Sequence, residues 1–203
     1  MLLSAGITIA QNRQADTSAR ADSARLLAVH FLYGSKPAKG SGLTEPKLFG
    51  GIHGGHVYLQ TGDTIFSFRP DHFPVHIFAH RKKRQSSYVI QNLSEFAADT
   101  AGYKMTTIWL PVNDSIETVL YRLRKNYRSQ TPYDYAFFGM RCAASAYEVL
   151  ARAGLVKKHS HFWDICLNFY PKPLRKRLLR RAERNGYKIT RKPGRPSRKW
   201  EKD

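Results

Sequence analysis

Cys142 lies where a nucleophile can form. It begins the run Cys142-Ala143-Ala144-Ser145, and the apolar spacing that follows predicts a helix over residues 142–153 that stops at Gly154. Unpaired N–H groups and the macrodipole at a helix N-terminus favour the thiolate, the nucleophilic form of cysteine. The small residues would let this helix end approach a sheet closely. The alternative is that Cys142 is a small buried residue that only opens a packed helix.

His56 is the candidate base for that nucleophile. It follows the glycine-rich residues 50–55, whose lack of side chains would let the backbone lie close beside a cleft. It begins a strand that leads into a predicted hairpin. If Gly62 and Asp63 form the turn, the strands pair Gln60 with Ile65, Leu59 with Phe66, Tyr58 with Ser67, Val57 with Phe68 and His56 with Arg69. A histidine on a strand that faces a helix N-terminus can take the proton of a thiol. The alternative is a structural or solvated histidine at a strand end.

The other histidines favour no metal site. Three of them recur every four residues, but two prolines would interrupt any helix that aligned them: His72, His76 and His80, with Pro70 and Pro74. His53 and His56 have no nearby carboxylate or thiolate to complete a site, and His159 and His161 lie in a predicted polar loop. We therefore expect no metal and no cofactor.

Cys166 lies in the apolar aromatic residues 162–167, a pattern typical of buried packing. If the protein is secreted, a disulfide between Cys142 and Cys166 is an alternative to two separate thiols. Such a bond would block the candidate nucleophile. We expect two separate thiols.

In the segments around these residues, apolar side chains recur either every two residues, as in strands, or every 3.6 residues, as in helices. Strands are expected over residues 27–33, 57–60, 65–68, 75–79, 88–90 and 104–112. Helices are expected over residues 94–100, 114–127, 142–153 and 171–185, the last ending at Gly186. Because strands and helices occupy separate runs, the sequence predicts the α+β class.

The ends of the chain differ from its middle. Lys and Arg total 34 against 15 Asp and Glu, a formal net charge of +19 that implies anionic partners. Residues 1–25 begin with an apolar stretch that resembles the rear half of a secretory signal and continue as a polar leader; a frayed N-terminus is the alternative. Residues 26–170 read as the catalytic domain, and residues 171–203 as a basic helix followed by a disordered basic end from Arg191. No apolar run is long enough to span a bilayer. The signal-like start leads us to expect a secreted or periplasmic protein of the cell envelope.

Two motifs together point to a known family. Gly54-Gly55-His56-Val57-Tyr58-Leu59 on a glycine-preceded strand is followed much later by Tyr133-Asp134-Tyr135 and Arg141-Cys142-Ala143-Ala144-Ser145. This order resembles the circularly permuted branch of the papain-like NlpC superfamily, which includes YiiX-like bacterial proteins and lecithin:retinol acyltransferase-like enzymes. The resemblance covers roughly residues 26–155. It implies a permuted papain-like fold, in which an antiparallel sheet packs against helices and the cysteine lies at a helix N-terminus.

The resemblance also implies roles for individual residues. Cys142 matches the nucleophile and His56 the general base. The family's third residue, which orients the histidine, is replaced here by candidates of different chemistry. Ser67 can accept the imidazole N–H weakly and is the expected third residue, whereas Arg69 can only donate; further candidates are Asp71, His72 and His76. We expect substrate contacts from Tyr58, Tyr133, Tyr135 and His53.

Two classes of function follow. The first is a cysteine hydrolase, a peptidase or amidase of cell-wall peptides or related acyl substrates, with acyl transfer left open. The second is a non-catalytic basic module that binds an anionic membrane, envelope polymer or nucleic acid through the basic helix: Arg175, Lys176, Arg177, Arg180, Arg181 and Arg184. Residues 191–199 resemble an AT-hook, but we favour a solvated end and do not expect nucleic acid. We expect a monomer.

Overall fold

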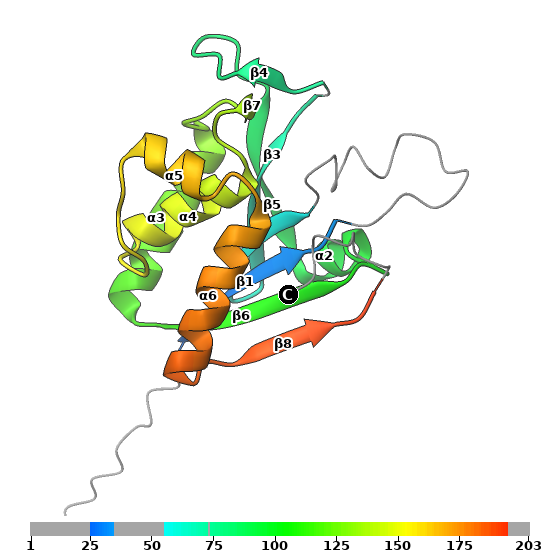
Figure 1. Ribbon diagram of the computed structural model, residues 1–203, viewed down its shortest axis with the longest axis vertical. Helices are drawn as coiled ribbons and strands as arrows, with labels where there is room; N and C mark the ends of the chain where they lie inside the picture. The colour runs from blue at the N-terminus through cyan, green and yellow to red at the C-terminus, as the bar shows by residue number, and fades with distance from the viewer. Residues whose placement is uncertain (1–24, 35–54, 73, 195–203) are drawn as a thin grey trace, which may run out of the picture.

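A six-stranded sheet organises the fold, as the computed structural model shows (Figure 1); residues 25–34, 55–72 and 74–194 are described. Its strand order is β5-β3-β2-β1-β6-β8, and all neighbours are antiparallel. The strands are β1 (Arg25–Leu32), β2 (His56–Thr61), β3 (Thr64–Pro70), β5 (Ser86–Asn92), β6 (Met105–Val112) and β8 (Ile189–Lys192). A second, parallel sheet pairs β4 (His76–Phe78) with β7 (Ala136–Phe138).

Five helices are present in the described part of the chain, and the α+β class is confirmed. They are α2 (Leu93–Asp99), α3 (Asp114–Ser129), α4 (Cys142–Arg152), α5 (His161–Leu167) and α6 (Pro171–Asn185). Alternation along the strands gives the sheet two apolar faces. The larger core joins one face to α3, α4 and α6, and a smaller cluster on the other face holds Tyr58, Ile65 and Phe96 of α2.

α4 is the central helix of the larger core. Every residue from Cys142 to Ala151 is buried. Ala143 and Ala144 have no exposed surface, and their small side chains let the helix backbone lie close to β2 and β3. The first turn of α4 is thereby fixed beside the start of β2.

The hairpin register is confirmed next to its turn and differs farther from it. Gln60 pairs with Ile65 and Leu59 with Phe66, and Gly62 has a positive φ of 55° in the turn. The predicted pairs from Tyr58 to His56 lie outside the pairing between β2 and β3, which ends at Leu59. There α4 packs against both strands, and the Val57 backbone lies near the Cys142 thiol.

The C-terminal elements belong to the same core and sheet. Leu174, Leu178 and Ala182 of α6 are buried in the larger core, and Gly186 ends the helix with a φ of 65°. β8 pairs with the outer edge of β6. The sequence analysis assigned Arg191 and Lys192 to a disordered end, but they form the end of β8, because backbone pairing with β6 orders them.

The basic helix is less free than its sequence indicates. Arg175 is fully buried, with its guanidinium 3.9 Å from the ring centre of Tyr33. Arg177 donates to the Asn168 side chain, and Arg181 donates to the Leu155 carbonyl. Three of the six cations proposed for anion binding therefore hold α6 in place, while Lys176, Arg180 and Arg184 are exposed.

The predictions for residues 161–167 are wrong in two respects. His161 begins helix α5 instead of lying in a loop, and Cys166 on that helix is exposed instead of buried. α5 turns Asp164 inward and leaves Phe162 and Trp163 exposed, so its apolar run faces outward. None of the helices among the described residues is both long and apolar enough to cross a bilayer.

His30 makes the fold sensitive to acid. Its Nδ1 and Nε2 lie 2.8 Å from Thr107 Oγ1 and 2.8 Å from Gln60 Oε1, and burial lowers its pKa to about 4. Because the unfolded chain binds a proton near pH 6.5 and the folded chain does not, the free energy of unfolding falls as pH drops from 6.5 towards 4. For this group the loss is about 3 kcal/mol.

We therefore expect His30→Gln to flatten the decline in stability between pH 6.5 and 4, as measured by urea denaturation at each pH. His72→Gln, which changes an exposed histidine, is the matched control and should keep the wild-type slope. Equal slopes in H30Q and wild type would contradict the assignment of a neutral buried His30.

Candidate active site

Cys142 occupies the first position of α4, against the start of β2. The backbone N–H groups of Val57 and Ala143 lie near its sulfur and lower the pKa of the thiol. Val57 follows His56 directly in β2, so the thiol lies against the backbone one residue from the candidate base. Gly55, with a φ of 101°, precedes His56, and this backbone conformation favours glycine at the point where the chain enters β2.

The thiol is protonated at rest. Burial raises the pKa of Cys142 above its usual value, although the Arg141 charge and the hydrogen bonds from Val57, Tyr135 and Ala143 lower it. Burial is the largest of these effects. A protonated thiol needs a base to become a nucleophile.

Tyr135 connects Cys142 to Arg141. The Tyr135 hydroxyl lowers the pKa of Cys142, and the Arg141 guanidinium lowers the pKa of both Cys142 and Tyr135. Burial, followed by the Cys142 charge, raises the pKa of Tyr135. The guanidinium of Arg141 also lies 4.8 Å from the ring centre of Phe169, which holds it beside the helix end. The Tyr135 hydroxyl can therefore stabilise negative charge on the Cys142 sulfur.

His56 is buried at the start of β2 and is neutral. Burial, and then the positive charge of Arg69, lower its pKa well below the usual value of 6.5. Its ring centre lies 4.7 Å from that of Tyr58, on the same face of β2. Tyr58 in turn has its pKa raised to about 12, by burial first and in part by the Cys142 charge. A neutral imidazole can accept a proton, as a general base must.

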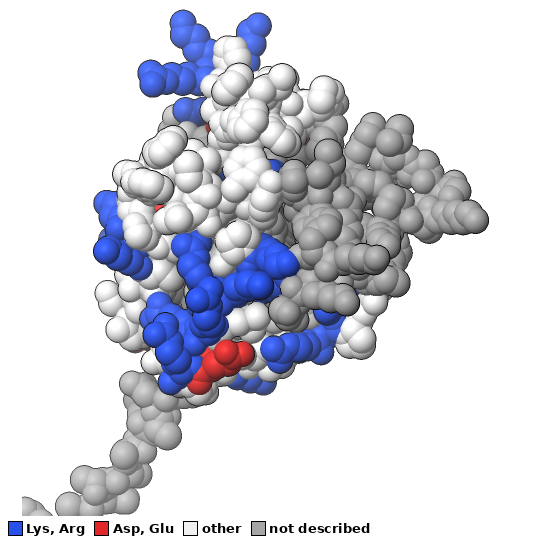
Figure 2. Space-filling view, viewed as in Figure 1, with Lys and Arg blue, Asp and Glu red and all other residues white. Residues whose placement is uncertain are grey.

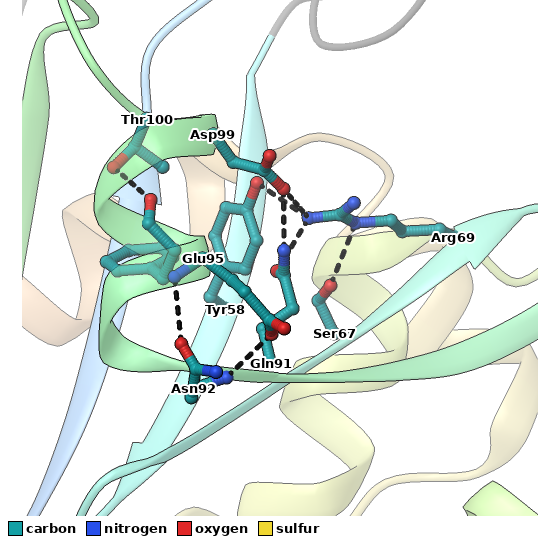
Figure 3. A network of polar contacts seen from close by, with 9 residues as sticks. Tyr58, Ser67, Arg69, Gln91, Asn92, Glu95, Asp99 and Thr100 are labelled. Atoms are coloured by element: carbon teal, nitrogen blue, oxygen red, sulfur yellow. Dashed lines mark hydrogen bonds and ion pairs between the residues drawn. The ribbon is translucent and has the colours of Figure 1, made fainter.

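Arg69 is the centre of a polar network on the face of the sheet that carries Tyr58 (Figure 3). Its Nη2 donates to Tyr58 Oη over 3.1 Å and to Gln91 Oε1 over 3.0 Å, and lies 3.6 Å from Asp99 Oδ2. Its Nε donates to Ser67 Oγ over 3.2 Å. These contacts fix the guanidinium where its charge opposes protonation of His56.

Ser67, the expected third residue, contacts the guanidinium of Arg69. Ser67 is buried on β3, and its oxygen accepts the Arg69 Nε–H. Of the further candidates, Asp71 accepts from Ser87 Oγ, and His76 Nδ1 lies 2.6 Å from Asp134 Oδ2. The last candidate, His72, is exposed at the surface, whereas His56 is buried.

The expected substrate contacts lie in different places. Tyr58 is fully buried, whereas Tyr135 is half-buried beside the thiol. Tyr133 donates to Glu148 and lines a pocket that also holds Asp134, Phe138 and His161. His53 lies outside the described residues. Of the three that the structure describes, Tyr135 is the one beside Cys142.

Sequence reasoning missed the roles of Arg69, Arg141 and Asp134. Asp134 accepts from His76, from the His80 N–H over 2.8 Å and from the Gln85 N–H over 2.9 Å. Its pKa is lowered, because these hydrogen bonds outweigh a burial effect that would raise it. An aspartate flanked by two tyrosines was visible in the sequence, but its partners lie some fifty residues earlier. In the described part of the chain, no group of three or more His, Cys, Asp or Glu side chains could hold a metal ion.

We expect Tyr135→Phe to raise the pKa of the Cys142 thiol further, because the variant loses a donor to the thiolate. The measurement is the rate of iodoacetamide labelling of Cys142 as a function of pH, followed by mass spectrometry. The exposed Cys166 is the internal reference. Tyr133→Phe, which removes a hydroxyl bound to Glu148, should leave the rate at Cys142 unchanged; equal slowing in both variants would refute the role of Tyr135.

We expect Arg69→Gln to raise the pKa of His56, because the nearby positive charge is lost. Nuclear magnetic resonance titration of the imidazole measures this directly. Arg69→Lys keeps the charge and should keep the low pKa. The same titration midpoint in R69Q and R69K would show that the charge of Arg69 does not act on His56.

Comparison of the chain with family models, with curated proteins and with solved structures finds no match. The chemistry of the residues around Cys142 is therefore the basis for assigning a function.

Proposed function

We propose that the protein is a cysteine hydrolase of the circularly permuted papain-like type, with Cys142 as nucleophile and His56 as general base. The observation that carries the proposal is the position of Cys142 at the N-terminus of α4, where the backbone of Val57, the residue after His56, lowers the pKa of the thiol. This position brings a buried thiol at a helix N-terminus to the start of the strand that bears a neutral histidine. The order of His-bearing strand and Cys-bearing helix supports the permuted form.

The reaction begins with a protonated Cys142 thiol and a neutral His56 imidazole. As Cys142 Sγ attacks an amide or ester carbonyl carbon, its proton passes around the start of β2 to His56, whose ring lies on the Tyr58 face of the sheet, and the carbonyl π bond becomes an oxyanion. Collapse of this intermediate breaks the C–N or C–O bond, and His56 returns the proton to the leaving group. Water, deprotonated by His56, then attacks the thioester, which releases the acid and restores the thiol.

The surroundings of the pair suit this cycle. A buried thiol and a neutral imidazole avoid the cost of holding an ion pair away from water before substrate arrives. Once the sulfur carries negative charge, the N–H groups of Val57 and Ala143 and the hydroxyl of Tyr135 stabilise it. The backbone N–H groups at the first turn of α4 have no intrahelical partner and can hold the oxyanion.

We propose cell-wall peptides or related acyl compounds as substrates, outside the cytoplasm. The support is the resemblance of the two sequence motifs to the NlpC superfamily, together with the formal net charge of +19, which suits an anionic envelope. The alternative, a binding module without catalysis, has the exposed cations of α6 in its favour and predicts no covalent intermediate.

The test is acyl-enzyme formation with p-nitrophenyl esters and with peptide amides, detected as added mass on the intact protein. Wild type should carry the acyl group on Cys142, and Cys142→Ala should carry none. Cys166→Ala is the matched control, because that thiol is exposed on α5 and should not affect acylation.

His56→Gln should slow acylation by about 10²- to 10⁴-fold, the range of a lost general base. His72→Gln, at an exposed histidine, should retain the wild-type rate. Acylation that persists in C142A, or that is equally fast in H56Q and H72Q, would exclude the proposed cycle.

A further inference from the structure

An exposed apolar surface lies on the small parallel sheet, away from the main core. Four side chains form it, which we name the β4–β7 patch: Ile77, Phe78, Phe137 and Phe138. They are 63%, 70%, 37% and 57% exposed. Single exposed apolar residues are common on protein surfaces, but four adjacent ones on two paired strands are an interaction surface.

The patch exposes apolar side chains on both faces of its sheet. Phe78 pairs with Phe138 in the register, and their rings stack with centres 5.6 Å apart. Ile77 and Phe137, one residue earlier in each strand, point to the opposite face. A two-stranded sheet with both faces exposed suits insertion into an apolar layer better than contact with a flat protein surface.

A cluster of positive charge follows the patch directly. We name residues 81–84 the basic loop; it consists of Arg81, Lys82, Lys83 and Arg84, all exposed. Residues 70–84 contain these four cations and a single acidic residue, Asp71. Figure 2 shows Lys and Arg gathered at the end of the molecule where Figure 1 places β4 and β7.

The basic loop is held in place relative to the patch. Asp134, two residues before β7, accepts hydrogen bonds from His76 of β4, from the His80 N–H and from the Gln85 N–H. Arg84 also donates to the Thr131 carbonyl. The cations and the aromatic rings therefore form one preorganised surface, so little conformational entropy is lost on binding.

We propose that the β4–β7 patch and the basic loop dock the protein on the surface of an anionic lipid bilayer. The aromatic rings enter the interface, and the cations contact lipid headgroups. The positive charge of the chain argues against a second copy as the partner that covers the β4–β7 patch. Each copy has a formal net charge of +19 and would bring the same four cations to the contact. Docking is independent of the proposed catalysis.

Sedimentation with vesicles tests this, using the full chain. Wild type should bind vesicles of phosphatidylglycerol mixed with phosphatidylcholine, and should not bind pure phosphatidylcholine. Lys82→Gln with Lys83→Gln should weaken binding about 30-fold, since each cation near such a surface contributes roughly a factor of five. Lys176→Gln with Arg180→Gln removes the same charge from α6 and should weaken it much less.

Phe78→Ser with Phe138→Ser should also reduce binding, whereas Tyr121→Ser, at an exposed aromatic of α3, should not. The loop variants change only exposed side chains, so they test the proposal even if the aromatic double variant fails to fold. No binding by wild type, or equal loss in the loop variant and its α6 control, would overturn the proposal. A wild-type dimer that F78S/F138S converts to a monomer, without vesicle binding, would identify a second copy as the occupant.

Discussion

The close packing of α4 on β2 and β3 is the constraint on which the rest of the structure depends. Alanines at the first turn bring the helix backbone near the sheet, and the Val57 backbone lies beside Cys142, where it lowers the pKa of the thiol. The register between β2 and β3 ends at Leu59, two residues away. The packing that buries the thiol therefore also gives it its polar surroundings.

On the opposite face of the sheet, several hydrogen bonds hold the Arg69 guanidinium in place. Arg69 contacts side chains from β2, β3, β5 and α2, which are distant in sequence. A guanidinium held by so many partners cannot turn away from its neighbours, and its field acts on His56 permanently. Burial of His56 in the sheet and the nearby charge of Arg69 therefore both favour the neutral imidazole.

The sequence was informative where the signal is local. The hairpin turn at Gly62 and the end of α6 at Gly186 follow from turn and capping chemistry, and both are found. The position of Cys142 beside Val57 depends on tertiary packing, and so do the partners of Ser67 and Asp134. Cys166 shows a different failure: apolar content indicated burial, but the helical period of α5 turns Asp164 inward and the aromatic side chains outward.

β8 completes the sheet with a strand whose free edge carries cations. Arg191 and Lys192 pair with Thr106 and Met105 of β6, and their side chains are exposed. An open strand edge is a template on which other chains can add, and closely spaced positive charges repel an incoming copy of the same strand. β8 thus protects the protein against edge-to-edge aggregation, a property that a sheet ending at the more apolar β6 would lack.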